Sequence, residues 1–299
     1  MSKKIPHIGI SILILLIFSA SFVLGRGHGH GKTNQHKQAI LLVAFGTTVP
    51  EARKAFDQIE SQVKSEFPGV EIRWAFSSSI VRKKLADEGV KLDSPKVALA
   101  RLIDDGYDRV VVASFHTLFG EEFHGLVADV NAIKGMSGKV PRKIALAWPL
   151  MSSRENIEKA IKSLIDQAPK TRKAEDAILL MGHGSEKHPA DTVYAAMNFY
   201  AQNADPKFFV ATVEGHPTLE DFIPKLKKEG VKKVFLMPFM AVAGDHARND
   251  MCGDDKESWK SVLLNNGFEV ECVLKGTAEN PDIVTLWINN IKAAYSHVK

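Results

Sequence analysis

Residues 177–184 read Ala-Ile-Leu-Leu-Met-Gly-His-Gly, an apolar run that ends in a histidine between two glycines. An apolar run without alternation is typical of a parallel strand that is buried on both faces. Two later apolar runs lead in the same way to Glu214 and to His246. Ligands of open parallel sheets bind beyond the carboxyl ends of the strands, so we predict that His183, Glu214 and His246 converge there.

Short apolar runs alternate with helical patterns from residue 39 onward. This alternation predicts an α/β fold of parallel strands flanked by crossover helices. The expected strands are residues 39–45, 70–76, 109–115, 143–148, 177–181, 208–213, 233–237 and 268–273. The expected helices are residues 51–65, 95–104, 121–133, 153–165, 190–201, 219–228, 257–264 and 281–295.

The two halves of the chain look like copies of one unit. The sequence Ala-Ile-Leu-Leu at 39–42 recurs at 177–180, and an acidic residue before Gly106 recurs before Gly230. We therefore predict two similar domains, residues 39–150 and residues 151–299, with the site in the cleft between them.

The same alignment predicts an asymmetric site. It pairs Phe45 with His183 and Phe76 with Glu214, and it pairs Glu122 with His246. The metal ligands then belong to the second domain, while the first domain offers two aromatic rings and one carboxylate.

The N-terminus has the order of a secretory signal. Lys3 and Lys4 precede an apolar stretch at 8–18, which small residues follow. We expect a signal peptide at 1–28, a glycine-rich linker at 29–38 and a periplasmic location, with an uncleaved membrane anchor as the alternative.

Composition narrows the classes of function. The net charge of +4 is spread along the chain without a basic block, which argues against a nucleic-acid partner. After signal removal we expect no membrane partner, and a homo-oligomer is left open. Cys252 and Cys272 are the only cysteines, and the sequence alone does not say whether they pair. Without a CxxCH, GxSxG or GxGxxG motif, the chain lacks the signatures of covalent haem, acyl transfer and hydride transfer.

Imidazole and carboxylate are ligands for divalent cobalt, nickel, iron and zinc, and three protein ligands leave coordination positions open. Each residue also has a plainer interpretation: His183 as a polar strand end, Glu214 as a helix cap and His246 as a loop residue. All three residues lie at or just past the carboxyl end of a predicted strand, and this shared position favours a metal site. The glycines beside His183 are expected to allow a sharp turn and the close approach of a flat ligand.

Four stretches together resemble the anaerobic sirohydrochlorin cobaltochelatases, a family of class II chelatases. They are residues 42–48 (Leu-Val-Ala-Phe-Gly-Thr-Thr), residues 181–185 (Met-Gly-His-Gly-Ser), residues 213–215 (Val-Glu-Gly) and the segment 237–250 around His246. The resemblance covers nearly the whole chain from residue 39.

The resemblance implies two similar α/β domains around a cleft and ATP-independent insertion of Co²⁺ into sirohydrochlorin, a tetrapyrrole. It also implies that His183 and His246 bind the metal and act in catalysis, with acidic help from Glu214 and Glu122. Fe²⁺ or Ni²⁺ could replace Co²⁺ as the substrate metal, because such ligands bind several divalent ions. Export is a departure, since cobalamin synthesis is normally cytoplasmic.

The remaining expectations concern substrate binding and an alternative function. Phe45 and Phe76 are expected either to wall the macrocycle or to pack in the core. Arg53, Arg82 and Arg248 are expected either to bind the substrate's carboxylates or to lie on the surface. His124 could ligate non-covalent haem or lie exposed. The alternative function is an exported, non-catalytic protein that binds or transports haem or metal on a chelatase fold.

Overall fold

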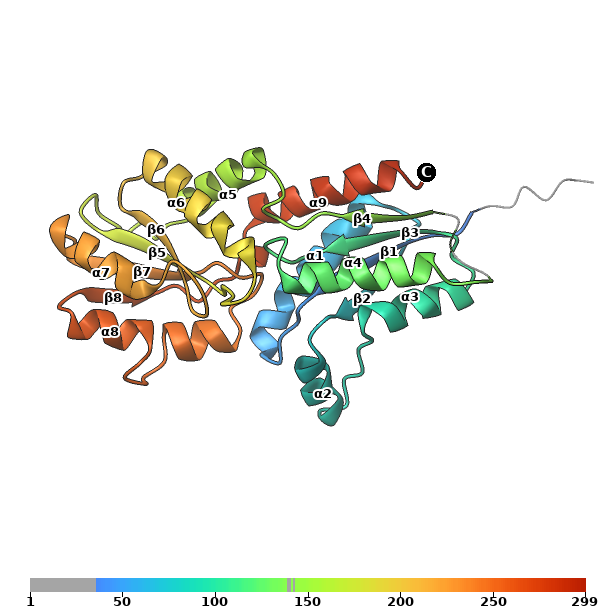
Figure 1. The fold of residues 1–299 in the computed structure, drawn as a ribbon, viewed down its shortest axis with the longest axis horizontal. Helices are drawn as coiled ribbons and strands as arrows, with labels where there is room; N and C mark the ends of the chain where they lie inside the picture. The colour runs from blue at the N-terminus through green and yellow to red at the C-terminus, as the bar shows by residue number, and fades with distance from the viewer. Residues whose placement is uncertain (1–35, 139–140, 142) are drawn as a thin grey trace, which may run out of the picture. The chain divides into compact units, whose positions relative to one another are not determined.

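The computed structural model describes residues 36–138, 141 and 143–299. Within this part of the chain, two four-stranded parallel sheets have the orders β2-β1-β3-β4 and β6-β5-β7-β8 (Figure 1). The second order repeats the first, which confirms the predicted α/β class with two similar sheet units. The expected signal peptide, and the linker up to residue 35, lie outside the described residues.

The bounds of the elements follow the predicted order. The first sheet contains β1 (Gln38–Ala44), β2 (Glu71–Phe76), β3 (Arg109–Ser114) and β4 (Lys143–Ala147), and its helices are α1 (Pro50–Glu66), α2 (Ser79–Asp87), α3 (Pro95–Asp104) and α4 (Glu121–Lys134). The second sheet contains β5 (Ala177–Gly182), β6 (Phe208–Thr212), β7 (Lys233–Pro238) and β8 (Glu269–Cys272). The helices of the second half are α5 (Arg154–Asp166), α6 (Thr192–Ala204), α7 (Leu219–Lys228), α8 (Trp259–Asn265) and α9 (Pro281–Ser296), with short turns η1 (Pro189–Asp191), η2 (Ala247–Met251) and η3 (Thr277–Glu279).

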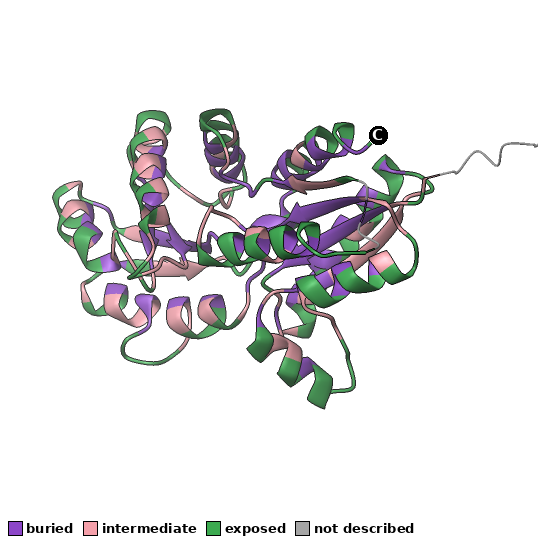
Figure 2. Ribbon diagram, turned by 45° about the vertical axis from the view of Figure 1, so that its right-hand side comes forward, coloured by how far each residue is buried: buried purple, intermediate pink, exposed green. Residues whose placement is uncertain are grey.

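All eight predicted strands are confirmed, and α2 is the one α-helix that the sequence analysis does not anticipate. α2 is only nine residues long, and Leu85 is its only buried residue. The central strands show the opposite pattern. Every residue of β5 is buried, because helices cover both faces of the parallel sheet (Figure 2).

The two sheets share one apolar cluster. It joins β1 residues such as Ile40 and Leu42 with β5 residues such as Ile178, and with much of α9. Although α9 follows the second sheet in sequence, it packs against β3 and β4 of the first sheet (Figure 1). Trp287 of α9 is fully buried, with its ring 5.3 Å from the ring of Phe115. The C-terminal helix therefore fastens the second half of the chain onto the first.

The two cysteines form a disulfide. Cys252, directly after the π-helical turn η2, pairs with Cys272 at the end of β8, with a Cα–Cα distance of 6.1 Å. The bond ties the segment that follows His246 to the edge strand of the second sheet. In the described ranges, no helix combines the length and the apolar character needed to span a bilayer.

Candidate metal centre in the cleft between the sheets

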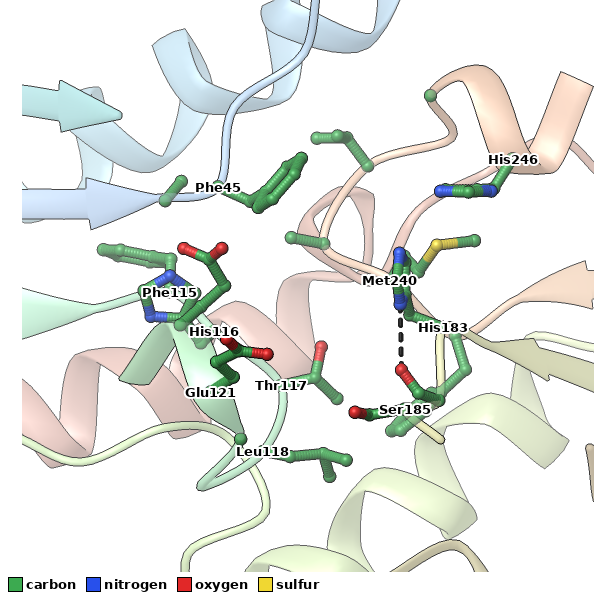
Figure 3. Close-up of a pocket in the computed structure, with 18 of the residues that line it drawn as sticks. Phe45, Phe115, His116, Thr117, Leu118, Glu121, His183, Ser185, Met240 and His246 are labelled. Carbon is green, nitrogen blue, oxygen red and sulfur yellow. Dashed lines mark hydrogen bonds between the residues drawn. The ribbon is translucent and has the colours of Figure 1, made fainter. Parts of the chain in front are cut away.

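A cavity of about 440 Å³ is lined by residues that follow the carboxyl ends of strands in both sheets (Figure 3). Phe45 follows β1, His116 follows β3, His183 follows β5 and Glu214 follows β6. This placement agrees with the expectation that the ligands of parallel sheets gather beyond the strand ends. His183 and Met240 lie on one side of the cavity, and Phe45 and His116 lie on the other (Figure 3).

The structure brings the predicted metal trio together. One ligand atom from each of His183, Glu214 and His246 lies within 4.8 Å of the others, and each side chain is at least partly exposed. The two imidazole rings meet edge to face with centroids 4.7 Å apart, and His183 Nδ1 lies 3.8 Å from Glu214 Oε2. Two nitrogens and a carboxylate at this spacing suit a divalent transition-metal ion and leave coordination positions open.

Hydrogen bonds determine which ring nitrogens remain free. His183 Nδ1 lies 2.9 Å from the carbonyl oxygen of Gly184, and His246 Nδ1 lies 2.6 Å from Asp250 Oδ2. Both oxygens accept, so each Nδ1 carries the proton and each Nε2 keeps its lone pair. Metal-binding histidines commonly donate their second N–H to a carbonyl or a carboxylate in this way.

Sequence reasoning missed Asp250. Its signal was present, because Asp250 follows His246 by four residues, the spacing of one helical turn. The turn itself was not predicted: η2 is a five-residue π-helical segment, too short for a periodic pattern.

The facing wall is built from the first sheet. Phe45 is 46% exposed, and Glu121 and Glu122 at the start of α4 also line the cavity. His116 is buried in this wall, where its Nδ1 lies 2.9 Å from Ser114 Oγ. Burial lowers the pKa of the His116 imidazole from 6.5 to about 4, so the ring is neutral at pH 7.

Strand register shows which positions in the two sheets are equivalent. Val43 pairs with Ser114 in the first sheet, and Met181 pairs with Pro238 in the second. Counting onward from these pairs makes His116 the equivalent of Met240. It also confirms the predicted equivalence of Glu122 with His246.

The equivalence of Phe76 with Glu214 is wrong. Ala44 pairs with Phe76, whereas Gly182, the equivalent of Ala44, pairs with Thr212. The two crossovers differ in length by two residues, so a constant alignment offset fails at this point. Phe76 is therefore a strand residue in the core. Its ring packs 5.4 Å from Phe56 and does not line the cavity, which corrects its predicted role in substrate binding.

The predicted arginines do not line the cavity either. Arg82 turns back on its own chain and donates to the carbonyl oxygens of Phe76 and Ser77, the latter at 2.7 Å. Arg248 is exposed and donates to the carbonyl oxygen of Ala243 at 3.3 Å. Arg53 lies partly exposed on α1. The structure places all three arginines outside the cavity, which corrects their predicted role in substrate binding. The sequence shows that these side chains are charged but not where they point.

Lining residues in the described chain include five carboxylates and neither lysine nor arginine. The carboxylates are those of Glu121, Glu122, Asp191, Glu214 and Asp245. A cavity lined by one sign of charge concentrates ions of the opposite sign, and so this cavity attracts cations.

The glycines around His183 act differently from the expectation. Gly184 has a φ of +79°, which confirms the sharp turn. A Cβ on Gly182, however, would overlap the ring of Tyr194, and one on Gly184 would lie 2.6 Å from Thr212 Cβ. The protein's own atoms fill this space, so these glycines accommodate neighbouring elements rather than a flat ligand.

The fold and the cavity define a class of metal chelatase, and the chain belongs to the cobalt chelatase (CbiK) family. The sequence model of that family matches residues 38–296. The chain is 38% identical over 269 residues to sirohydrochlorin cobaltochelatase CbiKC of Nitratidesulfovibrio vulgaris (strain Hildenborough), covering 89% of this chain and 94% of the relative. It is 32% identical over 260 residues to the sirohydrochlorin cobaltochelatase of Salmonella typhimurium (strain LT2), covering 86% of this chain and 96% of the relative.

Solved structures support the fold. SirB from Bacillus subtilis with Fe³⁺ superposes with a TM-score of 0.59 at 14% identity, covering 87% of this chain and 96% of that chain. CbiX, described as the terminal enzyme of siroheme biosynthesis in denitrifying bacteria, superposes with a TM-score of 0.53 at 17% identity, covering 86% and 99%. The predicted chelatase-like fold is confirmed.

The neutral state of His116 predicts how stability depends on pH. The unfolded chain binds a proton at this imidazole below about pH 6.5, whereas the folded chain does so only near pH 4. The unfolded state therefore holds more protons between these values, and the free energy of unfolding falls as the pH is lowered through this window. The full contribution is about 3 kcal/mol.

The measurement is denaturant unfolding from pH 7 to pH 4 of the wild type and of His116→Gln, with exposed His297→Gln as the matched control. We expect the His116→Gln profile to be flatter than that of the wild type and the control profile to follow the wild type. Equal slopes in the wild type and His116→Gln would contradict the assignment.

Proposed function

We propose that the protein inserts Co²⁺ into sirohydrochlorin without ATP and releases the two pyrrole protons. The main observation behind this proposal is that His183, Glu214 and His246 come together in the cavity. The chain is also 38% identical to a sirohydrochlorin cobaltochelatase. The names of both relatives give the substrate and the metal for those proteins.

Metal capture is the first step of the proposed mechanism. The acidic lining draws the hydrated cation into the cavity, and the trio replaces some of its waters. The Nδ1 hydrogen bonds to Gly184 and Asp250 hold both rings with Nε2 available. Glu214 offsets part of the charge of the ion. Three ligands hold the ion while leaving positions for the pyrrole nitrogens.

The macrocycle is proposed to lie between the two walls, with the ion delivered from the second-sheet side. Phe45, nearly half exposed on the facing wall, offers an apolar ring to the macrocycle. As the ring nitrogens bind the ion, two N–H protons leave, one pair of electrons staying on each nitrogen. Glu122 on the facing wall is the proposed acceptor of one proton, and a histidine freed from the metal is the proposed acceptor of the other.

Co²⁺ is proposed to be the physiological substrate metal, in keeping with the names of the relatives. Fe²⁺ and Ni²⁺ are proposed as competing substrates, because histidine and carboxylate ligands bind all three ions. Insertion rates measured side by side with the three metals would rank them.

Export to the periplasm is a second proposal. Its support is the signal-like order of Lys3, Lys4 and the apolar stretch at 8–18, together with the Cys252–Cys272 disulfide in the fold. Disulfides persist in oxidising compartments and are rare in the cytoplasm.

Haem binding at His124 is a third proposal, separate from chelation. His124 is exposed on α4, with its Nδ1 3.0 Å from His188 Nε2. The ring of Phe123 lies 6.1 Å from that of His124 and stacks edge-on with Phe119. The exposed imidazole of His124 offers an axial ligand. Phe123 is buried, so the partly exposed Phe119 is the ring of this pair that can meet a flat cofactor.

The insertion reaction tests the metal trio. We expect His183→Ala and His246→Ala to lower kcat/KM by more than the 10- to 100-fold that is typical of losing an outer partner of a metal ligand. The measurement is the absorbance change when purified protein, sirohydrochlorin and Co²⁺ are mixed. His297→Ala, an exposed histidine at the end of α9, is the matched control.

The proton step has a different signature in the same assay. Glu122→Gln keeps the metal ligands, so we expect kcat to fall while the KM for Co²⁺ stays near the wild-type value.

The histidine substitutions also have an outcome that would contradict the proposed site. If His183→Ala and His246→Ala insert the metal at the wild-type rate, the reaction occurs elsewhere.

Cell fractionation tests export. We expect the protein in the periplasmic fraction, with Cys252 and Cys272 unreactive toward a thiol reagent until a reductant is added. Deletion of residues 1–28 should leave the protein in the cytoplasmic fraction. A cytoplasmic full-length protein with two free thiols would refute the proposal.

Absorption spectroscopy tests haem binding. Purified protein mixed with haem is expected to give a Soret band that is lost in His124→Ala and kept in His297→Ala. A band unchanged by the His124→Ala substitution would exclude this histidine as the ligand.

A further inference from the structure

Two ligands of the metal centre stand on neighbouring loops that are fastened to each other. His183 begins the loop after β5, and Glu214 lies in the loop after β6. The amide of Glu214 donates to the carbonyl oxygen of His183 at 2.8 Å, and the amide of Val213 donates to that of Gly182 at 3.0 Å. The ladder between β5 and β6 thus continues up to the ligands themselves.

Beyond the ligands, one carboxylate oxygen joins the two loops. Asp191 Oδ2 accepts from the amide of Ser185 at 3.0 Å and from the amide of His216 at 3.1 Å. Ser185 follows His183 by two residues, and His216 follows Glu214 by two residues. A single atom therefore holds the two loops at matching positions, just past each ligand.

Local packing leaves little freedom to this arrangement. Asp191 ends the turn η1 and directly precedes α6, and three residues later the buried Tyr194 lies under Gly182. A Cβ on Gly215 would overlap the Asp191 carboxylate. The first turn of α6 thus occupies space that the loop glycines leave open, and the Asp191 carboxylate is in contact with both loops.

We propose that Asp191 is the positioning residue of the metal centre, setting the separation of His183 and Glu214 through its bonds to Ser185 and His216. The proposal rests on the trio being the metal site of the proposed function. Asp191 lines the cavity, but in this role it acts through the two loops and its hydrogen bonds, and its charge is secondary.

Co²⁺ titration of purified protein, followed by the visible absorption of the bound ion, tests the proposal. We expect Asp191→Ala to weaken Co²⁺ binding by up to about 10- to 100-fold, the range seen when a hydrogen-bond partner of a ligand side chain is lost, and to change the absorption band. The KM for Co²⁺ should rise more than kcat falls. Asp191→Asn keeps an oxygen acceptor without the charge, so it should restore binding and band close to the wild type.

Asp205→Ala is the matched control. Asp205 lies at the other end of α6, where its Oδ1 accepts from the amide of Lys207 at 2.9 Å, and it is ion-paired with Arg172. This substitution removes a loop-fastening carboxylate far along the helix from the ligands. It should lower the unfolding temperature while leaving Co²⁺ affinity and the absorption band unchanged.

Each outcome decides the question. A folded Asp191→Ala protein with wild-type affinity and band overturns the proposal, and so does an Asp191→Asn protein as weak as Asp191→Ala, because charge would then be the cause. If Asp191→Ala does not fold, Asp191→Glu replaces it: the charge remains but the oxygen moves, and wild-type binding would overturn the proposal. His183→Ala in the same titration distinguishes a failure of the Asp191 proposal from a failure of the metal site. Unchanged Co²⁺ binding by His183→Ala would refute the metal site itself.

Discussion

The apolar cluster shared by the two sheets is the constraint on which the cavity depends. Strand ends can form opposite walls only if the sheets are held at a fixed separation. Trp287 against Phe115 and the packing of α9 on β3 and β4 provide that fixation, because close-packed interiors resist displacement. The metal ligands themselves make few of these contacts, being partly exposed. The buried apolar cluster thus stabilises the fold, and the partly exposed residues after the strand ends form the metal centre.

Duplication of one α/β unit gives the two walls their equivalent positions and different side chains. Phe45 stands where the second sheet has His183, and Glu122 stands where it has His246. His116 likewise stands where it has Met240. One wall therefore carries nitrogen ligands and the other carries an apolar ring, a carboxylate and a neutral imidazole. A flat macrocycle between such walls would meet the metal on one face and a proton acceptor on the other.

The sequence predicts the strands, the fold class and the metal trio because each depends on position along the chain. Buried parallel strands are continuous apolar runs, and the residues after them lie at one edge. The sequence does not predict the features that depend on where a side chain points. Arg82 binds its own backbone, and Phe76 turns out to be a core residue once a two-residue difference between crossovers is seen in the strand register. Asp250 and Asp191 escape because their partners are set by short turns without periodicity.

The glycines of the metal loops have a different role in the structure from the one that the sequence suggests. In a sequence, a glycine beside a histidine is an empty space, and an approaching ligand is one way to fill it. In the structure that space is already taken, by Tyr194 at Gly182 and by Asp191 at Gly215. The glycines then serve the ligands by letting α6 press against both loops, which restricts where His183 and Glu214 can lie. A metal site held in this way has its geometry before the ion arrives, so less of the binding energy is lost in ordering the loops.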